Sequence, residues 1–323
     1  MIELSIMIEG MYDLTWPVWK RLVAEVEELG FAGLFRSDHF TVATSGYPDA
    51  LELIVSLTYL ADHTGRIHFG PLVAPVSFRN PVMLARQAAA LDDLSGGRMI
   101  LGVGAGWMER EHTMFGYELG DIPTRSARFA EALEVMTRLL RSEEPVTYSG
   151  RFYQLRDAML RPRPQRQGGP PLLLGGVGPR RTLPLVARYA DIWNATNVSL
   201  DEFRDRSGRL DELLREMGRQ PGDVKRSLMI TVFCGRNRTE LEERVRGFRR
   251  IEPELANMPL DALLDALRTR FHGIIAGSPD EVVEQIRAYE QAGVEELMAQ
   301  FFTVDDFAGI QLLAEQVLPQ LTV

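Results

Sequence analysis

The sequence contains little cysteine and no long hydrophobic run. Cys234 is the only cysteine among 323 residues, so the chain cannot form an internal disulfide bond, and we expect it in a reducing compartment, the cytoplasm. No stretch is apolar over enough residues to span a bilayer. The first residues, MIELS, lack the basic segment of a signal peptide. These absences predict a soluble cytoplasmic protein with no membrane partner.

Basic residues are outnumbered by acidic ones. The chain has 36 Lys and Arg against 45 Asp and Glu, a formal net charge of −9. Nucleic-acid backbones bind clustered Lys and Arg, so this balance argues against a nucleic-acid partner. The five histidines show no ligand spacing, and Glu109 with His112 forms one Glu-x-x-His motif where a di-iron bundle needs two. We therefore expect no metal site. A Gly-x-Ser-x-Gly elbow is also missing, which argues against a serine hydrolase.

The chain alternates short apolar runs with amphipathic helical stretches from end to end. This order predicts parallel strands with right-handed crossovers, as in a doubly wound sheet or a barrel. Eight strand–helix units in 323 residues favour an α/β fold of the (β/α)8 TIM-barrel type with insertions. The expected strands are residues 2–8, 31–35, 67–74, 98–103, 171–174, 190–194, 228–234 and 296–301.

The length beyond a plain barrel is expected in insertions within one domain, residues 1–323. No Pro/Ser-rich linker divides the chain. The insertions fall near 145–170, where a small hairpin precedes a proline-rich loop, and near 250–275, where the pattern is helical. Two further helices are expected, one behind the cap Thr124 and one from Pro179.

In a barrel, function resides where strands end and loops begin. One such end is rich in glycine and runs directly into the helix expected from Pro179. Backbone amides there, next to a helix N-terminus, could cradle a phosphate, although a tight turn that binds nothing has the same pattern. This end comprises Gly175, Gly176, Val177 and Gly178. At another strand end, Gly104 and Gly106 would let a planar ring approach the backbone.

Asp38 and His39, which follow the second strand, are the best candidates for acid–base catalysis. Histidine titrates near neutral pH, and a neighbouring carboxylate can tune its pKa. The alternative is a structural histidine that hydrogen bonds to the backbone.

Several segments together resemble the bacterial-luciferase-like flavin and deazaflavin oxidoreductases. They are FAGLFRSDHF at 31–40, GPLVAPVSFRNP at 70–81, GVGAGWMEREHTMFG at 102–116, residues 171–194, and GSPDEVVEQIRAYEQAGVEEL at 277–297. The resemblance covers essentially the whole chain. It implies a (β/α)8 barrel, usually a homodimer, that acts on a small-molecule substrate.

The Ser-Asp-His-Phe motif is typical of the branch of this family that uses the deazaflavin coenzyme F420 (8-hydroxy-5-deazaflavin) rather than FMN. The resemblance implies that Asp38 and His39 contact the ring system. It places the coenzyme phosphate on the amides of the 175–178 segment. It also implies a non-proline cis peptide bond beneath the ring, at Leu72–Val73.

One departure from the family concerns the substrate. The sugar-phosphate dehydrogenases of this family carry a carboxylate where Trp107 stands here, with Glu109 and Glu111 further along. We therefore expect an apolar or aromatic substrate rather than a sugar phosphate. The expected substrate pocket contains Glu9, Trp107, Trp193 and Phe301, with Phe302 beside them. For Trp193, ordinary core packing is the alternative.

Three functions follow from these observations. The first is an F420-dependent oxidoreductase that transfers a hydride between C5 of the deazaflavin and a small organic substrate. The second is a luciferase-like monooxygenase that uses reduced FMN and oxygen. The third is a non-catalytic flavin-binding protein.

Overall fold

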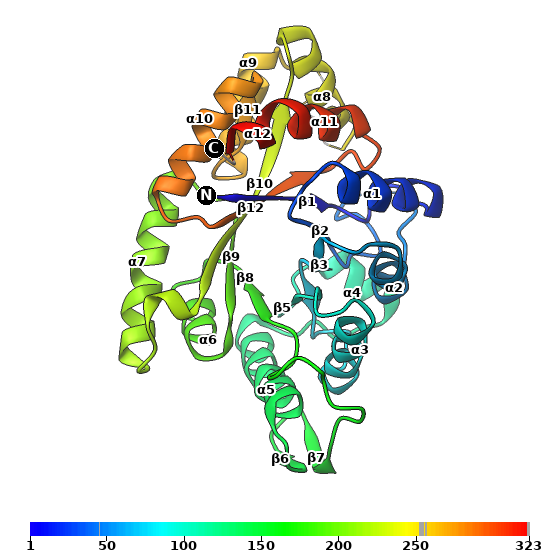
Figure 1. Cartoon of the computed structure of the whole chain (residues 1–323), viewed down its shortest axis with the longest axis vertical. Helices are drawn as coiled ribbons and strands as arrows, with labels where there is room; N and C mark the ends of the chain where they lie inside the picture. Colours follow the sequence, from blue (N-terminus) through cyan, green and yellow to red (C-terminus); the bar gives the residue numbers. More distant parts are fainter. Residues whose placement is uncertain (45, 252–254, 256, 322–323) are drawn as a thin grey trace.

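A computed structural model describes residues 1–44, 46–251, 255 and 257–321 of the chain. A parallel sheet runs around its centre, and helices surround the sheet (Figure 1). The sheet strands are β1 (Glu3–Ile8), β2 (Gly33–Arg36), β3 (His68–Pro71), β4 (Ala74–Pro75), β5 (Leu101–Gly104), β8 (Leu172–Gly175), β9 (Ile192–Thr196), β10 (Lys225–Cys234) and β12 (Glu296–Phe301).

The strands follow one another around the barrel in chain order. The hydrogen-bonded order is β3-β2-β1-β12-β10-β9-β8-β5-β4, with every pair parallel. A bridge between Phe69 and Met99 brings β3 next to the segment before β5. Because β3 and β4 are two halves of one barrel position, the sheet has eight positions. The predicted TIM barrel is confirmed.

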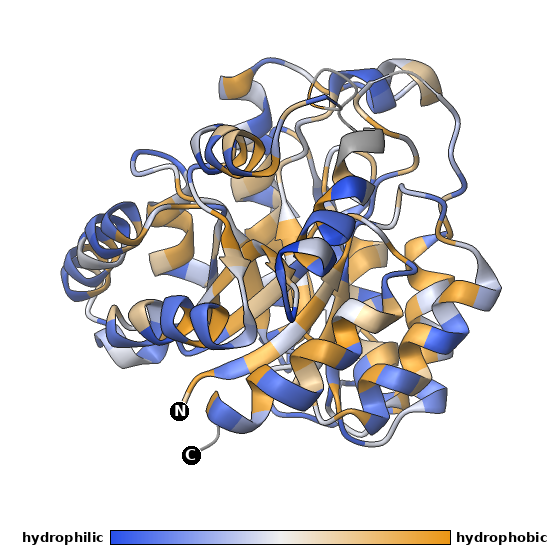
Figure 2. Ribbon diagram, turned by 90° about the horizontal axis from the view of Figure 1, so that it is seen from above, coloured by the Kyte–Doolittle hydropathy of each residue, from blue (hydrophilic) through white to orange (hydrophobic). Residues whose placement is uncertain are grey.

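The helices lie outside the sheet, and most of them pack an apolar face against it. They are α1 (Trp16–Glu28), α2 (Leu53–His63), α3 (Pro81–Leu94), α4 (Glu109–Phe115), α5 (Ile122–Arg141), α6 (Thr182–Tyr189), α7 (Leu200–Glu216), α8 (Arg238–Ile251), α9 (Leu260–Arg270), α10 (Pro279–Gln291), α11 (Phe307–Leu312) and α12 (Leu318–Leu321), with a π-helical turn at Leu313–Val317 and a 3-10 turn at Pro221–Asp223. In α1, Trp19, Leu22 and Val26 are buried at helical spacing. Figure 2 shows this division, with apolar residues on the central strands and polar residues on the outer faces of the helices.

Two of the expected helix starts are wrong. The cap of α5 is Asp121, whose carboxylate accepts a hydrogen bond from the amide of Thr124 at 2.8 Å, so Thr124 lies inside the first turn. The helix expected from Pro179 is α6, and it begins only at Thr182. The short helix α4 was not expected, and it carries a residue of the site described below.

Both insertions have the expected character. Strands β6 (Val146–Ser149) and β7 (Gln154–Ala158) form the antiparallel hairpin, which projects from one end of the molecule (Figure 1). At the opposite end, α9 and β11 (Ile275–Gly277) follow α8, and β11 pairs with the last residues of β10. Residues 252–254 and 256 of the second expected insertion lie outside the described residues.

Alternation along each strand separates two hydrophobic cores. The barrel interior holds one core, made of Met7, Phe35, Leu72, Ile100, Leu173, Ile192, Met229 and Met298. The larger core lies between the strands and the helices. The single cysteine, Cys234, is buried, and burial raises the pKa of its thiol to about 12, so it is a core residue. Among the described residues, no helix is long and apolar enough to cross a membrane.

Candidate functional site

The carboxyl ends of the barrel strands enclose a cavity of about 670 Å³. Every barrel position contributes to its wall. The lining residues discussed below are Glu9, His39, Leu72, Val73, Gly104, Gly106, Trp107, Glu111, Gly175, Gly176, Asn194, Asn197, Arg270, Gln300 and Phe302. In a (β/α)8 TIM barrel, catalysis is expected at this end of the strands, in a concave and mostly apolar site with a few polar groups.

The third barrel position forms the wall of the cavity next to β5 and β8. The peptide bond between Leu72 and Val73 is cis, as expected from the resemblance. The Val73 side chain fills the space that side chains on the flanking strands would occupy. A Cβ atom on Gly104 would lie 2.6 Å from Val73 Cγ2, and one on Gly175 would lie 3.2 Å from Val73 Cγ1. Gly104 is therefore required by protein packing, which the prediction of ring approach at Gly104 and Gly106 did not include. Gly175, predicted for the phosphate site, also packs closely against Val73.

His39 is held at the cavity wall by a buried carboxylate. Its Nδ1 lies 3.3 Å from Oε2 of Glu111, which comes from α4 and is 1% exposed. The same oxygen accepts a hydrogen bond from the amide of Phe40 at 2.8 Å. His39 Nε2 has no hydrogen-bond partner among the described residues. Glu111 thus fixes the imidazole from one side and leaves the other nitrogen available to a ligand.

Glu111 also sets the charge of His39. Burial lowers the pKa of the His39 imidazole, but the hydrogen bond to Glu111 and the negative charges of Glu111, Glu9 and Asp38 outweigh it and raise the pKa above 6.5. The imidazolium form therefore persists to a higher pH than that of a free histidine. Such a group can hold or donate a proton at neutral pH.

Asp38 does not line the cavity. Its carboxylate forms a two-point ion pair with Arg79, whose Nη2 lies 2.7 Å from Oδ1, and Arg79 also contacts Glu52 at 2.9 Å. This chain of contacts ties the end of β2 to the segment before α3 and to the start of α2. The structure thus places Asp38 outside the cavity lining, in an ion pair beside the loop that carries His39, whereas the resemblance implies a contact with the ring.

The glycine-rich loop after β8 has backbone amides without partners. The amide of Gly176 donates to the carbonyl of Asn194 at 2.9 Å. The amides of Val177, Gly178, Arg180 and Arg181 have no intramolecular acceptor among the described residues. Since α6 starts at Thr182, the loop itself supplies these donors, and the first turn of the helix comes after them. The loop can hold an anion as predicted, with less help from the helix than expected.

Two residues of the expected substrate pocket point the other way. Trp193 is fully buried outside the barrel, stacks on Phe203 at 5.5 Å and donates its indole N–H to the carbonyl of Gly176. Phe301 also belongs to the outer core. Successive strand residues face opposite sides, so their neighbours Asn194 and Gln300 face the cavity instead. The prediction that Trp193 and Phe301 line the pocket was wrong. On each strand, the neighbouring residue lines it instead.

The other expected pocket residues do line the cavity. Trp107 is 61% exposed at its mouth, and its ring meets that of His39 edge-on at 5.4 Å. Phe302 packs against Phe248 at 5.0 Å and with it forms part of an aromatic wall. Glu9 lies on the floor and accepts a hydrogen bond from Gln300 at 2.6 Å.

Sequence reasoning missed the roles of three polar residues, Glu111, Asn194 and Gln300. The contact between His39 and Glu111 joins positions 72 apart, and no local pattern reports such a pair. Asn194 and Gln300 could have been found from strand alternation alone, because each is one residue from an apolar side chain that faces the helices. The Oδ1 atom of Asn194 is buried without a hydrogen-bond partner.

No group of three or more His, Cys, Asp or Glu side chains that could hold a metal ion occurs in the part of the chain that the structure describes. His112, the histidine of the Glu-x-x-His motif, is a structural histidine. Its ring nitrogens lie 2.8 Å from the carbonyl of Met108 and 2.7 Å from Ser77 Oγ.

Known proteins share this sequence pattern and this fold. The F420-dependent glucose-6-phosphate dehydrogenase of Microbacterium testaceum is 28% identical over 310 residues, which cover 91% of this chain and 90% of that protein. The 4-hydroxyprotoasukamycin monooxygenase of Streptomyces nodosus subsp. asukaensis is 28% identical and covers 85% of this chain and 77% of its own length. The F420-dependent tetrahydromethanopterin reductase of Methanopyrus kandleri superposes with a TM-score of 0.79 at 21% identity, covering 98% of this chain and 99% of that one.

The sequence model of one enzyme family spans most of the chain, from residue 14 to residue 296. Its match includes the barrel strands β2 to β10 and the residues His39, Trp107 and Glu111 of the cavity. The chain belongs to the luciferase-like monooxygenase family.

Proposed function

We propose that this protein is an oxidoreductase that uses coenzyme F420 and transfers a hydride between C5 of the deazaflavin and a small organic substrate. The relative from Microbacterium testaceum and the structural neighbour from Methanopyrus kandleri are both named as F420-dependent. The observation that carries the proposal is the pair of His39 and Glu111 on the cavity wall, with a loop of unpartnered amides at the edge of the same cavity.

The residues present fit such a coenzyme. A planar ring would lie against the Leu72–Val73 backbone, between β4 and β8. Its phosphate would be held by the amides of Val177 and Gly178, with the exposed side chains of Arg180 and Arg181 adding positive charge nearby. The buried Oδ1 of Asn194 needs a hydrogen-bond donor, which a ring N–H can supply.

When bound, the deazaflavin supplies a carbon that accepts or donates a hydride. The protein supplies the proton chemistry and the environment. His39 holds a proton at Nε2, where a developing negative charge on ring or substrate can be stabilised. Trp107 at the mouth and Phe302 in the aromatic wall would limit the access of water to a bound substrate.

The proposal is tested by titrating the purified protein with oxidised F420 and, separately, with FMN, following the fluorescence of each. We expect saturable micromolar binding of F420 and much weaker binding of FMN. Micromolar FMN binding without F420 binding would overturn the proposal and favour a monooxygenase like the relative from Streptomyces nodosus. Binding of either coenzyme without turnover of any substrate would favour a flavin-binding protein.

We further propose that the protein acts as a homodimer in the cytoplasm. Two observations support this proposal: the family resemblance and the single cysteine, which is buried. Light scattering in solution is expected to give twice the 36.4 kDa mass of one chain. A mass of one chain would contradict the dimer without affecting the coenzyme assignment.

A further inference from the structure

Glu9 is a buried carboxylate with unused hydrogen-bonding capacity at the floor of the cavity. It directly follows β1, is 7% exposed, and accepts a hydrogen bond from Gln300 Nε2 through Oε1 at 2.6 Å. Its second oxygen has no intramolecular donor among the described residues. Because Glu9 lines the cavity, a donor group of a ligand can bind this second oxygen.

The neighbours of Gln300 fix the direction of its amide. Its Oε1 accepts from Thr231 Oγ1 at 2.8 Å and from Asn197 Nδ2 at 3.3 Å. Because the carbonyl oxygen is used by these donors, the NH2 group faces Glu9. Hydrogen bonds thus join Gln300 to Glu9, Thr231 and Asn197. They hold the Glu9 carboxylate in one position at the cavity wall.

The charge of Glu9 acts on His39 and on Arg36, the last residue of β2, but neither of them forms an ion pair with Glu9. His39 is paired with Glu111, and Arg79 is paired with Asp38 and Glu52. Arg36 donates to Ser56 Oγ and to two backbone carbonyls. Arg270 also lines the cavity, from the end of α9 beside the aromatic wall. No ion pair between Glu9 and a Lys or Arg occurs among the described residues.

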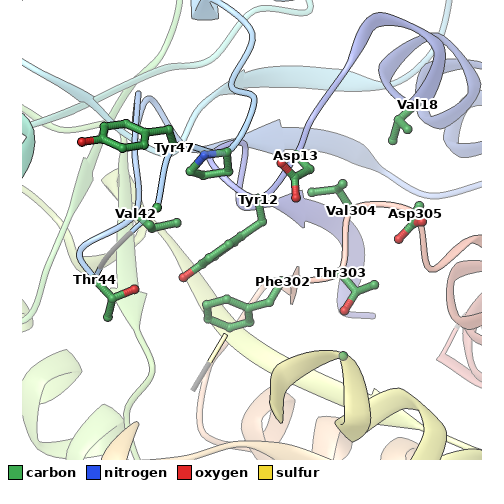
Figure 3. Close-up of a pocket in the computed structure, with 13 residues that line it drawn as sticks. Tyr12, Asp13, Val18, Val42, Thr44, Tyr47, Phe302, Thr303, Val304 and Asp305 are labelled. Atoms are coloured by element: carbon green, nitrogen blue, oxygen red, sulfur yellow. The ribbon is translucent and has the colours of Figure 1, made fainter. Parts of the chain in front are cut away.

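A second chamber of about 530 Å³ adjoins the cavity, and its lining includes the acidic residues Asp13 and Asp305. Tyr12 and Phe302 line both spaces, and their rings lie 5.8 Å apart, so they form the partition between them. Figure 3 shows the two rings at the centre, with Asp13 and Asp305 on the chamber wall beyond them. A substrate longer than the barrel cavity would reach these carboxylates past the aromatic pair.

We infer that Glu9 is a specificity-determining residue that binds a hydroxyl or ammonium group of the substrate, so that the enzyme takes alcohols or amines and disfavours a carboxylate or phosphate at that position. The inference rests on the proposed function only for the reaction that follows binding. It places the charged or polar end of the substrate on the floor and its apolar body against Phe302 and Met229.

The test uses three probes of similar shape: cyclohexylamine, cyclohexanol and cyclohexanecarboxylate. Their binding is measured by calorimetry at neutral pH, on the protein with and without F420. We expect the amine to bind at least about tenfold more tightly than the carboxylate, since a charge-assisted hydrogen bond is the stronger kind. Equal or tighter binding of the carboxylate in the native protein would overturn the inference.

Glu9→Gln should lower the affinity for the amine about tenfold while changing that for cyclohexanol about threefold or less. Glu9→Asp, which keeps the charge, should restore part of the preference for the amine. Glu3→Gln is the matched control, because Glu3 begins β1, at the opposite end of the barrel from Glu9, and pairs with Lys225. An unchanged preference in a folded Glu9→Gln variant would contradict the inference.

Failure of this inference can be distinguished from failure of the proposed function. Probe binding to the coenzyme-free protein tests Glu9 alone. A protein that prefers the amine through Glu9 yet binds no F420 would refute the coenzyme assignment and leave the role of Glu9 standing. A protein that binds F420 but binds cyclohexylamine no more tightly than cyclohexanecarboxylate, or keeps its preference for the amine unchanged in Glu9→Gln, would support the coenzyme and refute the role of Glu9.

Discussion

At the scale of single residues, the proposed chemistry depends on His39. Replacing a positioned general acid or base lowers turnover by about 10²–10⁴-fold, so His39→Ala should lower kcat by that factor. The affinity for the coenzyme should change only a few fold, because the loop amides and the Leu72–Val73 wall remain. Steady-state kinetics together with a fluorescence titration of the coenzyme measure both quantities.

His68→Ala is the control for this substitution. His68 begins β3, is exposed and has no role in the cavity, so both kinetics and coenzyme affinity should stay at the native values. If turnover by His39→Ala matched that of the native protein, His39 would be a structural histidine after all.

Glu111 should be visible in the pH profile. Its carboxylate is the main group that raises the pKa of His39 against the effect of burial. A step that needs the protonated imidazole has its full rate below this raised pKa, and the rate falls as the pH rises through it. Glu111→Gln removes the charge, so the alkaline limb of kcat/KM should move to lower pH. A limb that stays in place would show that Glu111 does not control the protonation of His39.

The Ser-Asp-His-Phe motif identified one half of this pair from sequence, and the structure supplied the other. Asp38 and His39 are adjacent in the chain, and adjacency is visible in a sequence. Glu111 reaches His39 only because α4 folds over the end of β2, and Asp38 is drawn away by Arg79, 41 positions along. Long-range contacts of this kind depend on the packing of whole elements.

At the scale of elements, the sequence predicted where the strands lie in the chain. It was less informative about which side chains of each strand face the barrel interior. Apolar runs between helical stretches marked every barrel position, because a strand buried on both faces is apolar throughout. For the same reason, the runs do not reveal which side chains face inward. Trp193 and Phe301 were assigned to the cavity on their chemistry, whereas alternation assigns them to the outer core and assigns Asn194 and Gln300 to the cavity.

The two tryptophans at the strand ends should therefore behave differently. Trp193→Ala removes a fully buried side chain and should lower the free energy of unfolding by about 3–5 kcal/mol. Trp107→Ala removes an exposed one and should change it by less than about 0.5 kcal/mol, while altering substrate affinity. Urea denaturation measures both. A large loss of stability for Trp107 and none for Trp193 would reverse the assignment of the two faces.

The loop after β8 offers a second prediction at this scale. Gly176 has φ +118°, which side chains rarely adopt, so Gly176→Ala should distort the loop and weaken F420 binding about tenfold or more. Gly218→Ala is the matched control, since Gly218 also has a positive φ of +75° but follows α7, outside the cavity lining. Its coenzyme affinity should be native, although its stability falls. Equal affinities for the two variants would remove the loop from the coenzyme site.

At the scale of the whole molecule, the net charge of −9 is compatible with an anionic coenzyme because the anion site is local. Unpartnered amides in one loop, with Arg180 and Arg181 beside them, provide positive potential where the phosphate would bind. The strand ends on the other side of the barrel carry Glu9, and the adjoining chamber carries Asp13 and Asp305. The distribution of acidic residues thus bears, in our account, on which substrates enter the cavity.

We expect residues 1–323 to unfold as one unit. Strand β1 pairs with β12, which joins the two ends of the chain within the barrel wall, and a barrel opened at this seam would lose contacts on both sides. Among the described residues, those beyond a plain barrel lie in the β6–β7 hairpin and around α9 and form no separate barrel.

The most direct test of the central claim follows hydride transfer itself. The protein is loaded with reduced F420 without oxygen and mixed with panels of carbonyl compounds and activated alkenes, and the reverse reaction is run with oxidised F420 and alcohols or amines. Our account predicts that oxidation of the reduced coenzyme requires an organic substrate, does not require oxygen, and slows about 10²–10⁴-fold in His39→Ala. Turnover that requires oxygen and proceeds only with reduced FMN would contradict it.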